Sequence, residues 1–194
     1  MDPAEADLVR ECLNGRKEAC RTLFLRIHPA IMPICMRFSD DERDAEAMLK
    51  EGTMRLFERL SSYKGEQPFQ EWTERLMVEV AIEHFHSLSE DRKQASMEEL
   101  DSGDAYALGF TPDEVFGRFS MNDLLKAVQR LSPLYRAIFN LHVIEGWSHE
   151  EIAAALRITP GGSRSGLNRA RMRLMDQFIR QDPALLAKRN RNGE

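Results

Sequence analysis

The chain has 194 residues, of which 42% are hydrophobic and 30% are charged, and its mean hydropathy is −0.47. No apolar run approaches the ~20 residues that are needed to span a bilayer. The acidic N-terminus MDPAEADLVRECL also lacks the layout of a signal peptide. We therefore expect no membrane insertion and a cytoplasmic location.

The net charge of −5 is distributed unevenly along the chain. Residues 1–90 carry a net charge of −6, residues 91–120 carry −4, and residues 121–194 carry +5. Nine of the basic side chains lie between residues 157 and 191. This asymmetry predicts two units of opposite sign, so the pooled charge of the chain says little about its partners.

Helix-start signals recur along the chain, whereas strand signals are scarce. Four of these signals pair a capping residue with a proline, and they are Asp2-Pro3, Thr111-Pro112, Ser132-Pro133 and Thr159-Pro160. Two more have the spacing of a capping box, Ser39…Glu42 and Ser148…Glu151. Between these starts the apolar residues recur at intervals of three and four, and Gly146 is placed to end a helix. The chain is predicted to be all-α.

The helical pattern stops in the polar, acidic segment from about Leu88 to Arg118, which is typical of a linker. We expect two small helical domains joined by this flexible linker, and the C-terminal one contains a helix-turn-helix. The expected parts are residues 1–90, a linker over 91–118, a second domain over 119–181 and a mobile tail over 182–194.

The three cysteines, Cys12, Cys20 and Cys35, are widely spaced among apolar residues. This pattern favours buried free thiols in a reducing compartment over a disulfide framework. The five histidines form no ligand pattern either. We therefore expect no metal site and no cofactor.

Arginines crowd the segment that follows Thr159-Pro160, and only a short turn separates it from the helix that begins at Ser148. This layout is typical of a helix-turn-helix. One buried stripe with bases on both flanks suits a groove between two rows of phosphates. Gly162 and Gly166 would then let the backbone approach DNA closely. The competing interpretation is an ordinary surface helix with solvated arginines.

The sequence from Leu131 to Leu174 resembles the C-terminal promoter-binding domain of the extracytoplasmic-function (ECF) group of bacterial RNA polymerase sigma factors. The likeness rests on short motifs, which are Leu131 with Pro133, Glu145-Gly146, Ser148 with Glu151-Ile152-Ala153, and Leu167 with Arg169-Ala170-Arg171. The N-terminal half is similar to the helical domain of the same family. With the linker, the resemblance spans nearly the whole chain.

The resemblance implies a protein that catalyses nothing and that directs core RNA polymerase to promoter DNA, usually under an anti-sigma factor. The −35 duplex would contact residues of the basic helix, namely Gly162, Ser163, Arg164, Ser165, Asn168, Arg169, Arg171 and Arg173. The melted −10 strand would contact Tyr63, Lys64, Gln67, Phe69, Trp72 and Arg75, although core packing is the competing interpretation for Phe69 and Trp72. Polymerase would bind Glu46, Leu49, Lys50, Glu51 and Phe57.

The sequence departs from the family pattern in its first domain. The docking helix has Ala47 and Lys50 where the family usually has Asp and Gln. Four glutamates lie on or near the helix that is expected to meet DNA, namely Glu71, Glu74, Glu79 and Glu83. Carboxylates repel phosphates unless they are neutralised.

The altered docking residues and the net charge of −6 on residues 1–90 keep a second function open, a sigma-like module that sequesters an anti-sigma factor or polymerase without starting transcription. A third interpretation is a stand-alone helix-turn-helix repressor, which would leave the N-terminal resemblance unexplained.

Overall fold

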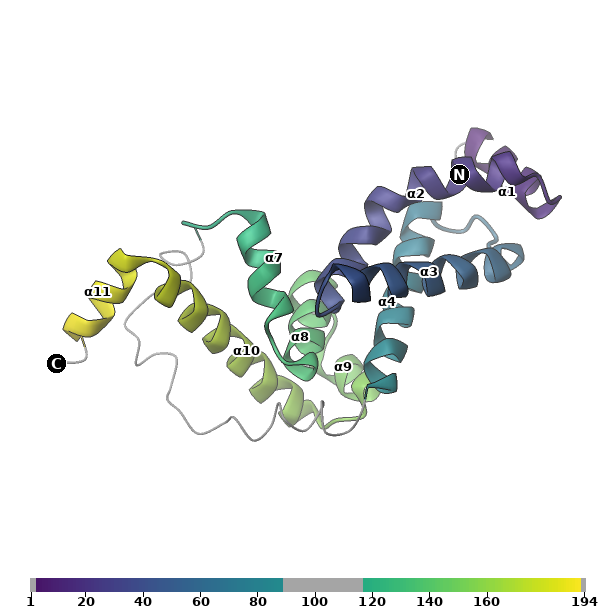
Figure 1. Ribbon diagram of the computed structural model, residues 1–194. Helices are drawn as coiled ribbons and strands as arrows, with labels where there is room; N and C mark the ends of the chain where they lie inside the picture. The colour runs from purple at the N-terminus through teal and green to yellow at the C-terminus, as the bar shows by residue number, and fades with distance from the viewer. Residues whose placement is uncertain (1–2, 89–116, 193–194) are drawn as a thin grey trace. The chain divides into compact units, whose positions relative to one another are not determined.

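The computed structural model describes residues 3–88 and 117–192, and within these ranges all regular secondary structure is helical. The chain divides into two compact units, Met1–His84 and Phe85–Glu194. The first unit ends near the expected boundary at residue 90. The expected linker lies outside the described residues except for its last two positions. Helices follow one another from purple to yellow in Figure 1.

The first unit is built from α1 (Pro3–Leu13), α2 (Lys17–Phe38), α3 (Glu42–Arg59), the short 3₁₀ turn η1 (Leu60–Ser62) and most of α4 (Phe69–Ser87). Helix α2 packs against both α1 and α3. Apolar side chains of α2, α3, η1 and α4 form the core, including Leu23, Ile27, Ile31, Met48, Leu56, Leu60 and Met77. Their burial supplies the main stabilisation of the unit.

Helices α3 and α4 approach each other closely at Gly52. A Cβ atom added at Gly52 would collide with the end of the Met77 side chain. The missing side chain therefore lets a methionine fill the space between the two helices.

The start of α3 differs from the prediction. The expected cap Ser39 is fully buried, and Asp41 caps the helix instead, because its carboxylate accepts a 2.9 Å hydrogen bond from the Asp44 N–H. Asp41 has an extended backbone, as capping residues usually do.

Two of the three cysteines are not free thiols. A disulfide joins Cys12 at the end of α1 to Cys20 in the first turns of α2, and their Cα atoms are 4.9 Å apart. The prediction of three free thiols is therefore wrong for this pair, because the short turn between the helices brings the two side chains together. Cys35 is a buried free thiol as expected, and burial raises its pKa to about 12.

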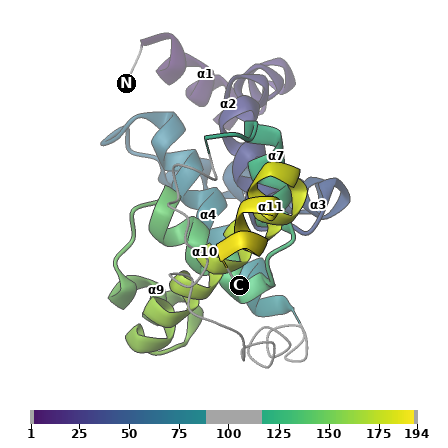
Figure 2. The same ribbon diagram turned by 90° about the vertical axis from the view of Figure 1, so that its left-hand side faces the viewer.

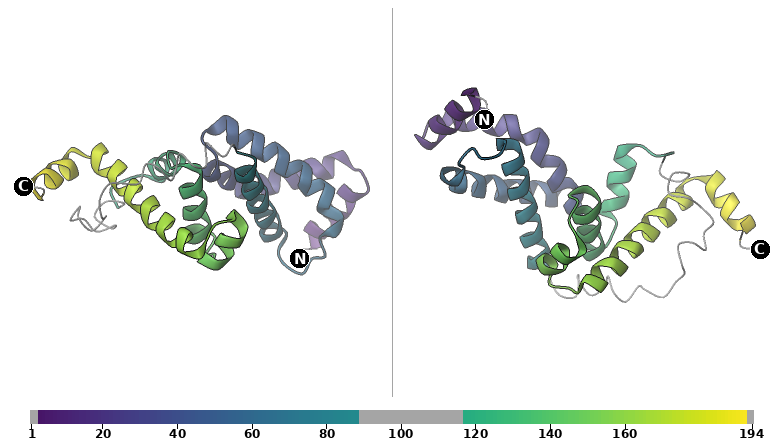
Figure 3. Two further views of the ribbon diagram at one scale, coloured as in Figure 1. Left: turned by 90° about the horizontal axis from the view of Figure 1, so that it is seen from below. Right: turned by 180° about the vertical axis from the view of Figure 1, so that it is seen from behind.

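The second unit contains five α-helices among its described residues, with a π-helical segment between two of them. The α-helices are α7 (Met121–Gln129), α8 (Pro133–Phe139), α9 (His149–Leu156), α10 (Pro160–Gln181) and α11 (Pro183–Asn192), and the π-helix η3 (Asn140–Ile144) continues α8. Figure 3 shows α10 running past α8 and α7, with α11 at its end. Gly146 follows η3 with a φ of 74°, which confirms the predicted helix end.

The tail that we expected to be mobile from residue 182 forms α11 instead. Leu185 is buried in the core of the unit, and Arg189 donates a 2.7 Å hydrogen bond to Asp176 of α10. The Asp182 carboxylate accepts a hydrogen bond from the Ala184 N–H and caps the helix. Asp182-Pro183 is the same start signal as Thr159-Pro160, so the sequence did contain the sign that was missed.

Candidate nucleic-acid interface

Helices α9 and α10 form the predicted helix-turn-helix, and they lie side by side in Figure 2. Ser148 caps α9 in a complete capping box with Glu151, as predicted, and hydrogen bonds from Ser148 hold the Glu151 pKa below its usual value. Thr159 caps α10, because its hydroxyl accepts a 3.0 Å hydrogen bond from the Gly162 N–H. Both helix starts are therefore fixed by their own capping residues.

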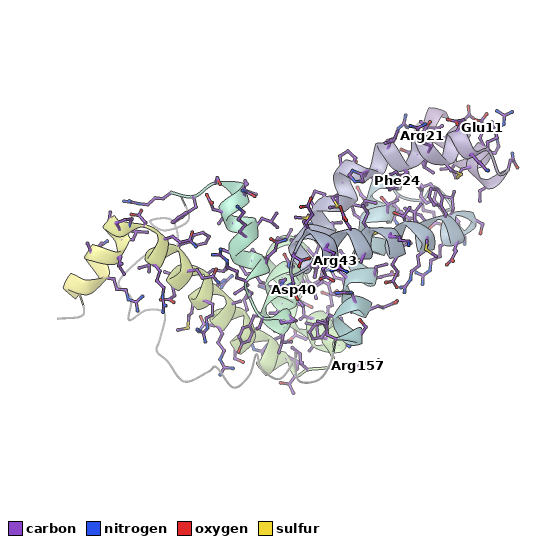
Figure 4. All side chains as sticks on the ribbon, viewed as in Figure 1. Glu11, Arg21, Phe24, Asp40, Arg43 and Arg157 are labelled. Atoms are coloured by element: carbon purple, nitrogen blue, oxygen red, sulfur yellow. A yellow bond between two sulfur atoms is a disulfide. The ribbon has the colours of Figure 1, made fainter. Side chains whose placement is uncertain are left out.

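Arg157 forms the turn between the two helices (Figure 4). Its φ of 58° lies in the left-handed region, which is uncommon for a residue with a side chain. The sharp reversal at this residue makes the short connection to α10 possible.

Helix α10 has a buried side and a basic side. Its buried side packs on α8 and α9 and includes Leu167, Ala170 and Leu174. Arg164, Ser165, Asn168 and Arg171 are exposed, and Arg169 and Arg173 are half-buried. Among the described residues, no carboxylate lies within ion-pair distance of Arg169 or Arg171, whereas Arg164 lies 3.5 Å from Glu150. The basic face is therefore available to an anionic partner.

Ser163 does not belong to this exposed face. Its side chain is fully buried, and its hydroxyl lies 2.9 Å from Nδ1 of His149. The prediction of a DNA contact for Ser163 is wrong, because its buried hydroxyl faces α9 and hydrogen-bonds His149 there. The His149 ring also stacks on His142 at 4.4 Å. Burial and the nearby cations lower the His149 pKa.

The two glycines of the basic helix serve different purposes. Gly162 is exposed in the first turn, where its N–H meets the Thr159 cap. Gly166 is buried, and a Cβ atom there would lie 2.5 Å from Cδ1 of Ile138 on α8. The prediction that Gly166 lets DNA approach the backbone closely is therefore wrong, because its missing side chain makes room for Ile138 of α8 instead.

In the first unit, three aromatic side chains gather where the loop after η1 meets the start of α4. The Tyr63 ring lies 5.0 Å from Phe69 and 5.3 Å from Trp72, and Phe69 and Trp72 stack at 5.7 Å. Phe69 is 1% exposed, so it belongs to the core as the competing interpretation held. Tyr63 and Trp72 are half-buried, and burial raises the Tyr63 pKa.

The remaining residues of this predicted strand site surround the aromatic group. Lys64 and Arg75 are exposed, and Gln67 is half-buried. The Tyr63 hydroxyl donates a 2.7 Å hydrogen bond to the backbone carbonyl of Gln67, which fixes the loop. All of the predicted site except Phe69 therefore presents some surface to solvent.

The predicted polymerase contacts lie on α3, but not all on one face. Glu46, Leu49, Lys50 and Phe57 fall on one side of the helix at 3.6 residues per turn. Glu51 lies apart from them and accepts a 2.7 Å hydrogen bond from Arg55. Arg55 also pairs with Glu83 of α4. Glu51 is thus committed to an ion-pair network between α3 and α4.

The described residues also bear on metal binding and on membrane spanning. In the part of the chain that the structure describes, no three His, Cys, Asp or Glu side chains are grouped to hold a metal ion. None of the helices among those residues combines the length and hydropathy that crossing a membrane requires.

Sequence comparisons identify relatives for most of the chain. The family described as sigma-70, region 4 matches residues 121–174. The ECF RNA polymerase sigma factor SigE of Mycolicibacterium smegmatis is 30% identical over 150 residues, which cover 76% of this chain and 56% of that protein. The ECF RNA polymerase sigma-E factor of Escherichia coli K12 is 24% identical over 170 residues, which cover 84% and 88%. The chain thus spans little more than half of the mycolicibacterial relative.

Among solved structures, the sigma factor RpoE of Bartonella quintana in complex with the anti-sigma factor NepR is similar. It is 21% identical, with a TM-score of 0.49, over 84% of this chain and 97% of that one. The region 4 match begins with α7 and ends within α10, so it contains α9 and most of the second arm of the helix-turn-helix described above. Residues 121–174 thus match the sigma-70 region 4 family, and most of the chain is similar to ECF RNA polymerase sigma factors.

Proposed function

We propose that this chain directs core RNA polymerase to specific promoters and catalyses no reaction itself. The basic face of α10 carries the proposal, because it combines solvent-accessible arginines with a buried side that holds the helix on its unit. A helix presented in this way fits the major groove of duplex DNA. The −35 contacts are assigned to α10, namely Gly162, Arg164, Ser165, Asn168, Arg169, Arg171 and Arg173.

The aromatic group of the first unit supports a second contact, to the melted −10 strand. Half-buried aromatic rings offer stacking surfaces to unpaired bases, and exposed cations beside them attract the phosphates. Tyr63, Trp72, Lys64 and Arg75 meet this description. In this role the free energy that favours promoter opening comes from tighter binding of the opened promoter than of the closed one.

Docking on core polymerase is assigned to the side of α3 that carries Glu46, Leu49, Lys50 and Phe57. Leu49 and Phe57 are half-buried apolar residues between exposed charged ones, a composition that suits a protein interface. Control by an anti-sigma factor and a cytoplasmic location are parts of the same proposal.

In vitro transcription with purified core polymerase and a library of promoter fragments tests this function. We expect transcripts from a defined subset of promoters only when the chain and the core are both present. Tight binding to an anti-sigma factor without any transcript would support the sequestering module instead. Tight, specific binding to duplex DNA without polymerase would support the repressor.

A further inference from the structure

The outer face of α4 changes character along its length. Trp72 and Arg75 lie on the same face as Glu79 and Glu83, because residues three, four and seven positions apart share one side of a helix. A strand that contacts Trp72 and Arg75 and follows the helix axis would next meet the two carboxylates. The first half of this face suits binding of a nucleic acid, whereas the carboxylates of the second half repel its phosphates.

Each of these carboxylates is paired with an arginine of α3. Arg59 donates a 2.9 Å hydrogen bond to Glu79, and both side chains are about half exposed. Arg55 pairs with Glu83 and, at 2.7 Å, with Glu51, and its side chain is 24% exposed. The bond to Glu83 is the main reason that the pKa of Arg55 is raised. Both arginines are therefore held within the unit.

We propose that Glu79 and Glu83 hold Arg59 and Arg55 away from the promoter and thereby weaken the binding of the unpaired −10 strand. The inference rests on the proposed function and adds a determinant of promoter affinity to it. Without the two carboxylates, Arg59 would lose its ion-pair partner on α4 and Arg55 would keep only Glu51, so the surface beyond Trp72 and Arg75 would be less acidic.

The effect does not require the ion pairs to be strong. Exposed pairs are weak, so an arginine can turn from its carboxylate toward a phosphate. That movement leaves an unpaired carboxylate beside the same phosphate, and the repulsion cancels much of the gain. Removal of the carboxylate therefore favours strand binding whether the arginine stays beside that position or turns toward a phosphate.

The two positions are expected to differ in size of effect. Glu79→Gln leaves Arg59 without an ion-pair partner among the contacts described here, whereas Glu83→Gln leaves Arg55 paired with Glu51. For single strands the logarithm of affinity changes with the logarithm of salt concentration by about 0.7 per phosphate contact. One new contact therefore corresponds to a gain of about fivefold at 0.1 M salt.

The experiment measures holoenzyme binding to fork-junction DNA with an unpaired −10 segment, taken from a promoter found in the transcription assay. We expect Glu79→Gln to tighten binding about fivefold at 0.1 M salt and to steepen the salt dependence by about 0.7. Glu83→Gln should give a smaller gain. Adding Arg59→Gln to Glu79→Gln should remove the gain, because the released cation is then absent.

Glu18→Gln is the matched control, since it removes one exposed carboxylate of the same unit from α2. Circular dichroism melts of every variant test whether the fold is retained. An equal gain in Glu18→Gln, or no gain in a folded Glu79→Gln, would overturn the inference while leaving the proposed function intact. If the wild-type holoenzyme binds no unpaired strand, both are overturned.

Discussion

Gly166 of α10 leaves no room for a methyl group above Ile138 of α8, since its added Cβ would lie 2.5 Å from the Ile138 Cδ1 atom. Ile138 is fully buried, so it has little freedom to move aside. The middle of the proposed recognition helix therefore lies directly on the helix beneath it.

We predict that Gly166→Ala destabilises the second unit by about 1 kcal/mol. Overpacking costs about 1–3 kcal/mol, and the better helix propensity of alanine returns up to about 1 kcal/mol. The free energy of unfolding, from urea titrations, checks this. Ile138→Val should restore stability in the Gly166→Ala background, because it removes the colliding atom. Gly161→Ala, whose Cβ would make only an ordinary 3.9 Å contact with the Thr159 hydroxyl oxygen, should not destabilise the unit.

Arg157→Gly is predicted to stabilise the second unit by up to about 1 kcal/mol. The left-handed φ of 58° costs about 1–2 kcal/mol with a side chain, and the larger backbone entropy of unfolded glycine offsets part of the relief. The thermal midpoint of unfolding measures the change. Arg157→Ala should bring no such gain, and equal midpoints for the two variants would contradict the argument from strain.

Arg169→Ala is predicted to weaken binding of the −35 duplex by about 1–3 kcal/mol if its side chain reads a base. The holoenzyme affinity for matched and mismatched −35 duplexes measures this. A similar loss on all sequences, with a salt slope lower by about one, would assign Arg169 to a phosphate instead. Unchanged affinity would count against the placement of α10 in the groove. Arg180→Ala, at the far end of α10 and paired with Asp176, is the control.

The second unit is predicted to lose stability as the pH falls from about 7.5 to 5.5. Burial and nearby cations lower the His149 pKa from 6.5, so the unfolded chain binds a proton more readily than the folded one. Stability from neutral His149 is therefore complete above its unfolded pKa and is lost as the pH falls toward the lowered value. Thermal midpoints across this range should fall less in His149→Gln than in the wild type.

Reduction of the Cys12–Cys20 disulfide is predicted to destabilise the first unit by about 2–3 kcal/mol. The bond joins residues eight positions apart in the chain, and its loss returns conformational entropy to the unfolded chain. Urea titrations with and without a dithiol reductant measure the difference. The variant with Cys12→Ser and Cys20→Ser should match the reduced protein and should not respond to the reductant.

The sequence predicts best where the signals are local. The capping box of Ser148 and Glu151, the proline start at Thr159 and the stop at Gly146 are all confirmed, because each depends on residues within one or two helical turns. Together they place both arms of the helix-turn-helix without tertiary information.

Errors arise where a side chain is positioned by a distant element. Phe69, Ser163 and Gly166 all carry features that suit DNA contact, and all three are buried. Gly166 in particular meets a residue 28 positions earlier in the chain, a pairing that no local pattern reveals. The ion pairs that neutralise Glu79 and Glu83 depend in the same way on how α3 lies against α4.

The contact of Trp72 with the rings of Tyr63 and Phe69 gives this protein an internal optical reporter. A base that stacks on the indole would change the polarity of the indole's surroundings and the quenching of its fluorescence. Emission from Trp72 would therefore report binding of the unpaired strand without an added dye. The other tryptophan, Trp147, belongs to the second unit and offers a reference signal within the same chain.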